Sequence, residues 1–145
     1  MTIRPRVVRA VRAARAHLRD VAAAEHAHRR AEADLASRDL VSATDVLDAH
    51  LAAAPDKLAG ATSVSQVIRV IAAVDLERRV VAEAATSADQ AADRSRQAAD
   101  QLRTRERALR TVDRVAERLQ EARTEAESRA EQVASDELAA RPRAP

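Results

Sequence analysis

Hydrophobic residues recur at alternating spacings of three and four along two long stretches of the chain. This spacing places them on one side of an α-helix, as in helices that pack lengthwise against each other. The predicted seam of the first stretch is Val7, Val11, Ala14, Leu18, Val21, Glu25, His28, Glu32 and Leu35. The predicted seam of the second stretch is Val64, Val67, Ile71, Val74, Arg78, Val81, Ala85, Ala88, Ala92, Ser95, Ala99, Leu102, Glu106 and Leu109.

The residues that interrupt helices gather between these two stretches. Pro55 predicts the end of the first helix, and Gly60 is suited to the left-handed conformation that often follows a helix. Ser63 and Gln66 form a capping box, in which each side chain bonds the backbone N–H of the other residue. We therefore expect a helix over about 6–54, a turn over about 55–63 and a helix over about 64–139.

A chain that folds back near residue 59 or 60 should place residue i opposite roughly residue 119 minus i. That rule sets Leu47 against Ile71 and Val11 against Leu109, while alanines face alanines between them. The expected fold class is therefore all-α: a long antiparallel two-helix coiled-coil hairpin, forming one domain over 1–145 and monomeric when isolated. The second helix is the longer, so its C-terminal segment, from about residue 114, is expected to overhang.

Composition limits what such a hairpin can do. The chain has 37 alanines and no aromatic residue, so it can build a seam between helices more readily than a globular core with a catalytic pocket. It has no cysteine, which excludes disulfides and zinc–thiolate sites. Charged residues interrupt its most apolar window, which argues against membrane insertion. We expect a non-enzyme with no cofactor.

The charge is distributed unevenly although the formal net charge is only +2. Residues 1–19 and 102–118 together hold twelve arginines and three acidic residues, a net of +9. A concentrated patch of like charge favours an oppositely charged partner. The arginines assigned to partner binding are Arg4, Arg6, Arg9, Arg12, Arg15, Arg103, Arg107, Arg110, Arg114 and Arg118.

Three interpretations of these arginines are open: a solvated face, a docking surface for an acidic protein, and a nonspecific nucleic-acid site. Nucleic acid is disfavoured because no aromatic side chain can stack on a base. Glu25 and His28 form a single Glu-x-x-His motif, which di-iron bundles use twice. With Glu32 they occupy predicted seam positions, so we interpret them as a polar layer that sets register and expect no metal site.

The stretch from Leu102 to Arg143, "LRTRERALRTVDRVAERLQEARTEAESRAEQVASDELAARPR", resembles the arginine- and glutamate-rich region of the FliJ/YscO-like stalk proteins of bacterial type III secretion and flagellar export. The resemblance implies a cytoplasmic protein at a secretion apparatus of the inner membrane. It implies a central stalk that links a hexameric export ATPase to the export-gate protein. The alternatives are a free-standing coiled-coil export chaperone or scaffold and a nucleic-acid-binding hairpin.

Overall fold

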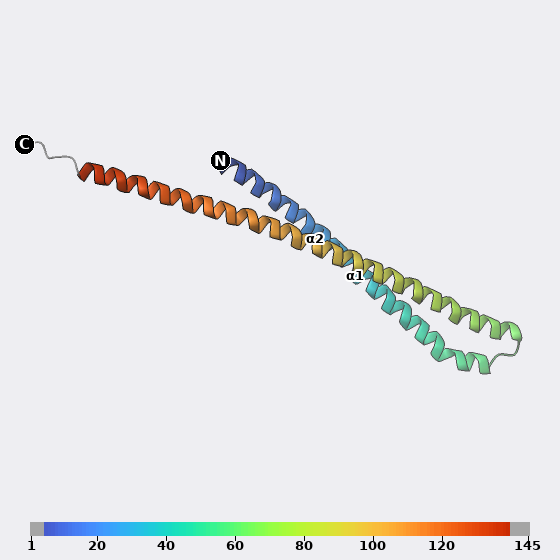
Figure 1. Cartoon of the computed structure of the whole chain (residues 1–145). Coiled ribbons are helices and arrows are strands. Elements are labelled where there is room, and N and C mark those ends of the chain that lie inside the picture. The colour runs from blue at the N-terminus through green and yellow to red at the C-terminus, as the bar shows by residue number, and fades with distance from the viewer. Residues whose placement is uncertain (1–4, 140–145) are drawn as a thin grey trace, which may run out of the picture. The chain divides into compact units, whose positions relative to one another are not determined.

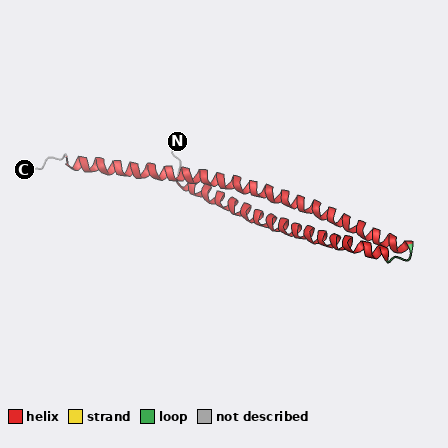
Figure 2. Cartoon of the chain, turned by 90° about the horizontal axis from the view of Figure 1, so that it is seen from below, coloured by secondary structure: helices red, strands yellow, loops and turns green. Residues whose placement is uncertain are grey.

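A computed structural model describes residues 5–139, apart from the side chain of residue 138. The helix α1, Pro5–Ala59, has 55 residues, and α2, Val64–Ala139, has 76 residues. Residues 60–63 connect them, and the described part of the chain contains no strand (Figures 1 and 2). The expected all-helical hairpin is therefore confirmed. Pro5 starts α1 at a position where its missing N–H would have no helical partner.

The prediction that Pro55 ends the first helix is wrong. Pro55 lies inside α1, which continues for four more residues to Ala59. Proline leaves the carbonyl one turn earlier without its N–H partner, but Pro55 is exposed, so water can reach this part of the helix. Figure 1 shows the last turns of α1 changing direction before the connection, as a proline inside a helix produces.

The glycine at the turn also behaves differently from its predicted role. No glycine in the described part of the chain has a positive φ, so Gly60 does not adopt the left-handed conformation. Its N–H instead donates to the Asp56 carbonyl at 3.0 Å, which continues the helical pattern. The Ala61 N–H then donates to the Leu58 carbonyl at 3.2 Å, which tightens the last turn.

The capping box at the start of α2 is confirmed. The Gln66 N–H donates to the Ser63 hydroxyl at 3.4 Å, and the Ser63 N–H donates to Gln66 Oε1 at 3.2 Å. The same amide oxygen accepts the Thr62 N–H at 2.6 Å. Two N–H groups before α2 therefore find an acceptor in the first turn of α2, which holds that turn in place.

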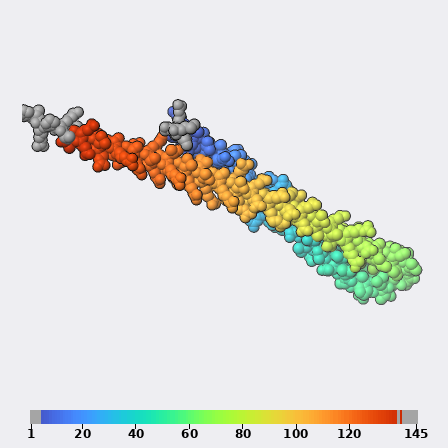
Figure 3. All heavy atoms as spheres, in the orientation of Figure 1, coloured from blue at the N-terminus to red at the C-terminus, as the bar shows by residue number. Residues whose placement is uncertain are grey.

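The chain divides into two compact units. The turn unit comprises residues 21–102, and the terminal unit comprises residues 1–20 and 103–145. Within the turn unit, α1 and α2 lie side by side, and the face shown in Figure 3 has no deep hollow there. Ala91 and Ala98, which are 3% and 6% exposed, are the most deeply buried side chains described. Contact between the helices therefore depends on small residues.

The predicted seams are partly wrong in the turn unit. In α2, the predicted positions 67, 74, 81, 88, 95 and 102 are half-buried, but Val70 and Glu77 are less exposed than the predicted Ile71 and Arg78. In α1, the predicted Val21 and Leu35 are exposed, whereas the residues that follow them, Ala22 and Ala36, are half-buried. Alanine at the contact lets the two backbones approach closely. The larger aliphatic side chains then lie beside the contact.

The register between the helices also differs from the predicted rule, within each unit. The rule places His50 opposite residue 69, but its Nδ1 atom is 3.6 Å from Glu77 in the turn unit. It places Arg12 opposite residue 107, but its Nε atom is 2.6 Å from Asp113 in the terminal unit. In the turn unit, the position of the turn shifts the register in this direction, because the connection lies at residues 60–63 and is not centred near residue 59 or 60.

Candidate functional site

The predicted partner-binding arginines that the structure describes all belong to the terminal unit. We call them the arginine-rich surface: Arg6, Arg9, Arg12 and Arg15 on α1, and Arg103, Arg107, Arg110, Arg114 and Arg118 on α2. Arg4 lies outside the described residues. All of the described members are exposed except Arg15, which is half-buried. The terminal unit therefore presents guanidinium groups from both helices to solvent.

One arginine of this surface ties the two helices of the terminal unit together. The Nε–H of Arg12 donates to Asp113 at 2.6 Å, a contact between residues far apart in sequence. The hydrogen bond and the charge of Asp113 raise the pKa of Arg12 above its ordinary value. Asp113 is half-buried, so this pair positions α1 against α2. Arg12 therefore stabilises the contact between the two helices as well as forming part of the arginine-rich surface.

The other arginines divide into those with a partner within the protein and those without an ion pair in the described residues. Arg110 lies 3.6 Å from Glu106 on the same helix, and Arg103 also interacts within the protein. Within the described residues, five exposed members have no ion pair: Arg6, Arg9, Arg107, Arg114 and Arg118. These five guanidinium groups keep their full hydrogen-bonding capacity for an acidic surface.

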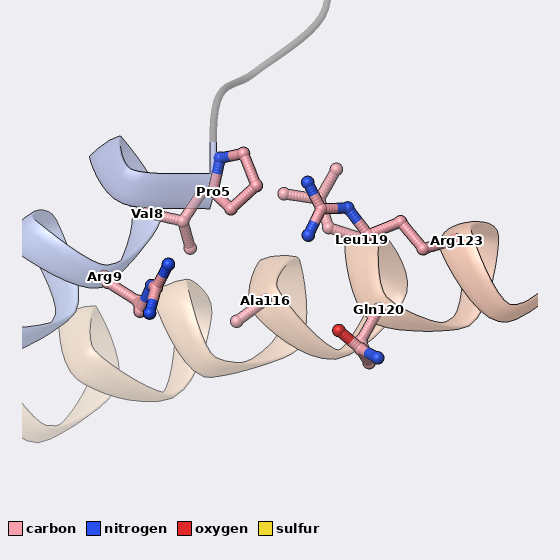
Figure 4. Close-up of a pocket in the computed structure, with 7 residues that line it drawn as sticks. All are labelled: Pro5, Val8, Arg9, Ala116, Leu119, Gln120 and Arg123. Atoms are coloured by element: carbon pink, nitrogen blue, oxygen red, sulfur yellow. The ribbon is translucent and has the colours of Figure 1, made fainter.

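A groove of about 400 Å³ lies between the helices of the terminal unit. It is lined by Pro5, Val8 and Arg9 of α1 and by Ala116, Leu119, Gln120 and Arg123 of α2 (Figure 4). The four apolar members are half-buried, and the three polar members are exposed. Of these residues, only Arg9 was assigned to the site from sequence. Leu119 and Arg123 lie beyond Leu109, where the predicted seam of the second helix ends.

A second group of charges, in the turn unit, differs from the predicted polar layer. Arg29 donates to Glu25 at 2.7 Å and to Glu32 at 2.9 Å, and His28 lies 3.3 Å from Glu32. These contacts run along α1 itself, and Glu25 and His28 are exposed, so their predicted place in the seam is wrong. Hydrogen bonding to Arg29 lowers the pKa of Glu32 and, reciprocally, raises that of Arg29.

Arg29 is half-buried and occupies the interhelical position next to the predicted one. A shallow pocket around it is lined by Glu25 and Arg29 of α1 and by Arg94, Gln97, Ala98 and Gln101 of α2. The charge of Arg94 also contributes to the lowered pKa of Glu32. The ion pairs of this cluster therefore join residues one turn apart on α1, and the cluster borders α2 at the pocket.

Two buried side-chain nitrogen atoms of the described residues have no hydrogen-bond partner: Nε of Arg19 and Nδ1 of His50. His50 Nδ1 lies 3.6 Å from Glu77, just beyond hydrogen-bonding distance. This near contact joins α1 to α2 within the turn unit. Another nitrogen of Arg19, Nη2, lies 2.9 Å from its neighbour Asp20.

Metal sites and membrane spans are not found between residues 5 and 139. No group of three or more His, Asp and Glu side chains in this part of the chain is arranged to hold a metal ion. Neither helix, as far as it is described, has a segment apolar enough to cross a membrane. The chain matches no family model, and no curated protein and no solved structure is significantly similar to it.

Proposed function

We propose that this protein is a non-enzymatic helical adaptor whose arginine-rich surface binds an acidic surface on a partner protein. The observation that carries the proposal is the set of five exposed arginines without an ion pair in the described part of the terminal unit. The guanidinium groups of such a surface repel one another, and binding of carboxylates lowers the free energy by offsetting this repulsion. The turn unit offers no comparable surface, because its acidic residues outnumber its basic ones.

The proposed architecture is an antiparallel coiled coil with an overhanging C-terminal segment. The half-buried residues of the turn unit support the coiled coil, because they recur at spacings of three and four on both helices. On α1 they include Ala22, His26, Arg29, Ala33, Ala36, Leu40, Ala43, Leu47, His50 and Ala54. The overhang is supported by exposure, since every side chain from 121 to 137 is exposed.

The partner that best fits the resemblance is the hexameric ATPase of a type III export apparatus. In that role the hairpin is a central stalk that promotes the ATPase and links it to the export-gate protein, on the cytoplasmic side of the inner membrane. A single helical hairpin inside a ring of six subunits can favour one subunit over the others, because it presents a different face to each. The alternative is an export chaperone or scaffold, which would bind a partner without stimulating ATP hydrolysis.

The test replaces arginines that have no ion pair in the fold. Arg107→Gln, Arg114→Gln and Arg118→Gln remove three charges from one face of α2 while keeping good helix formers. The matched control replaces three exposed arginines of the turn unit, Arg30, Arg38 and Arg79, which have no ion pair among the described residues either. Both variants have the same net charge, so a difference between them reports the location of the binding surface.

The measurements are affinity for the protein that co-purifies with the chain and stimulation of an export ATPase. We expect the first variant to lose about tenfold or more in affinity and the control to keep wild-type affinity. Added salt should weaken the wild-type complex, because exposed charges are screened. Equal affinity for the two variants overturns the docking surface. Binding without ATPase stimulation favours the chaperone or scaffold, and tight, salt-sensitive binding to DNA or RNA instead favours the nucleic-acid alternative.

A further inference from the structure

We infer that the groove of the terminal unit receives one large aliphatic side chain from an acidic amphipathic helix of the partner. This inference rests on the proposed function and specifies the chemistry of the partner. Its basis is that one opening combines an apolar floor with two exposed cations, Arg9 and Arg123. The two features call for a ligand that carries an apolar group and negative charge close together.

The floor and walls of the groove are apolar. Pro5 and Val8 of α1 face Leu119 of α2 across the small side chain of Ala116, and α1 begins at this end of the contact (Figure 4). All four residues are half-buried, so each keeps apolar surface that a ligand can cover. Covering apolar surface is favourable in proportion to the area removed from water. A volume of about 400 Å³ is sufficient for one large aliphatic side chain.

The rim of the groove is cationic. Arg9 comes from α1 and Arg123 from the opposite side of the groove on α2, where Figure 4 shows its side chain turned back toward Leu119. Neither guanidinium forms an ion pair within the described residues, and both are exposed. The nearby acids Glu117 and Glu121 do not line the groove. The cations are thus available to carboxylates on either side of a seated aliphatic residue.

An amphipathic helix supplies this combination because residues three and four apart share a face. A leucine with a glutamate one turn before it and another one turn after it places two carboxylates beside one apolar side chain. A nucleic acid would use the guanidinium groups and leave the apolar floor without a contact. A small molecule would remain largely exposed in an opening that is bounded by only two helices. The groove therefore favours a helix of a protein partner.

The probe is a stapled helical peptide of about 15 residues with one central leucine flanked by glutamates at those positions. Three matched peptides carry serine for the leucine, glutamine for the two glutamates, or both changes. Affinity for the full-length protein is measured by fluorescence anisotropy. We expect the leucine-to-serine and glutamate-to-glutamine changes each to weaken binding by about tenfold or more, because each removes one of the two recognised features.

Variants of the protein give the second arm. Ala116→Leu fills the groove without changing charge, and Arg9→Gln with Arg123→Gln removes the cationic rim. Each should weaken binding of the parent peptide by about tenfold. The controls are Ala126→Leu, exposed on α2 outside the groove, and Arg30→Gln with Arg38→Gln, which removes two exposed arginines that have no ion pair among the described residues; both controls should bind like the wild type. Circular dichroism verifies that each variant remains helical.

The outcomes separate this inference from the proposed function. If the glutamates and the arginines matter but the peptide leucine and Ala116→Leu do not, the acidic-surface proposal stands and the groove inference is overturned. If none of the changes affects binding, or the parent peptide does not bind, the groove inference fails. The arginine variants of α2 then decide the proposed function by themselves. The peptide substitutions keep the test decisive even if Ala116→Leu disturbs the fold.

Discussion

The turn unit and the terminal unit are built from the same two helices but differ in charge and in packing. The turn unit holds 9 basic and 13 acidic residues, whereas the terminal unit holds 16 arginines and 10 acidic residues. In the turn unit, several arginines pair with acids one turn away on their own helix, as Arg78 does with Asp75 and Arg96 with Asp93. In the terminal unit, arginines exceed acids, and several of those described have no ion pair.

Packing shows the same contrast. The two buried residues of the described chain, Ala91 and Ala98, both lie in the turn unit, where alanines allow close approach. The described part of the terminal unit has no buried residue, and the pair Arg12–Asp113 links its helices at the surface. The turn unit therefore depends on tight apolar contact for its stability. The terminal unit keeps charge and an open groove that a partner can use.

The substitution with the largest expected effect disrupts the close contact between α1 and α2 in the turn unit. Ala98→Leu places a large side chain where only 6% of alanine is exposed, so we expect a loss of about 1–3 kcal/mol in the free energy of unfolding. Hydrogen exchange should accelerate mainly within residues 21–102, because overpacking acts on that unit. Chemical denaturation and exchange mass spectrometry measure both quantities.

The matched control for this overpacking is Ala82→Leu, since Ala82 is exposed on the same helix of the turn unit. Its effect should stay within about 0.5 kcal/mol, as for most surface substitutions. If Ala98→Leu is as well tolerated as Ala82→Leu, close approach of the helices is not what stabilises the turn unit. The contrast between the two units would then rest on charge alone.

Much of the fold could be predicted from sequence because the apolar spacing and the capping residues are local signals. The positions at which each helix faces the other were harder to predict, because residues adjacent in sequence are often similar in size and polarity. Ala91 is followed by Ala92 and Ala98 by Ala99, so two neighbouring stripes fit the pattern almost equally well. Only packing against the other helix selects between them, and it selects the first of each pair as the more buried.

The candidate site was predictable in composition but not in pairing. The arginines could be assigned to one end of the hairpin, because their positions in sequence place them far from the turn. The partner of Arg12 depended on the register between the helices of the terminal unit, which the spacing of residues along each single helix does not determine. Arg123 was missed because the groove exists only where the start of α1 meets Leu119. A repeat along one helix does not show where the other begins.

Two substitutions with a smaller expected effect test which residues of α2 face α1 in the turn unit. Val70 is half-buried, whereas the predicted seam residue Ile71 is 52% exposed. We expect Val70→Ala to cost about 1 kcal/mol and Ile71→Ala to cost about half of that, although isoleucine loses more atoms. Urea denaturation of the two variants gives the comparison. The opposite order would restore the seam predicted from sequence.

The smallest expected effect lies at the turn, where the two helices of the turn unit are joined. A Cβ atom at Gly60 would lie 3.5 Å from the Asp56 carbonyl oxygen, an ordinary van der Waals contact, and the φ angle is not positive. Gly60→Ala should therefore stabilise the protein by about 0.4–1 kcal/mol, because alanine restricts the unfolded chain without straining the folded one.

The control is the reverse kind of substitution, Ala59→Gly at the end of α1, which should reduce the free energy of unfolding by about 0.5–1 kcal/mol. Thermal and urea denaturation of both variants measure the difference. A loss of stability for Gly60→Ala would mean that the turn requires a left-handed glycine, and that the register of the turn unit is set differently from the one described.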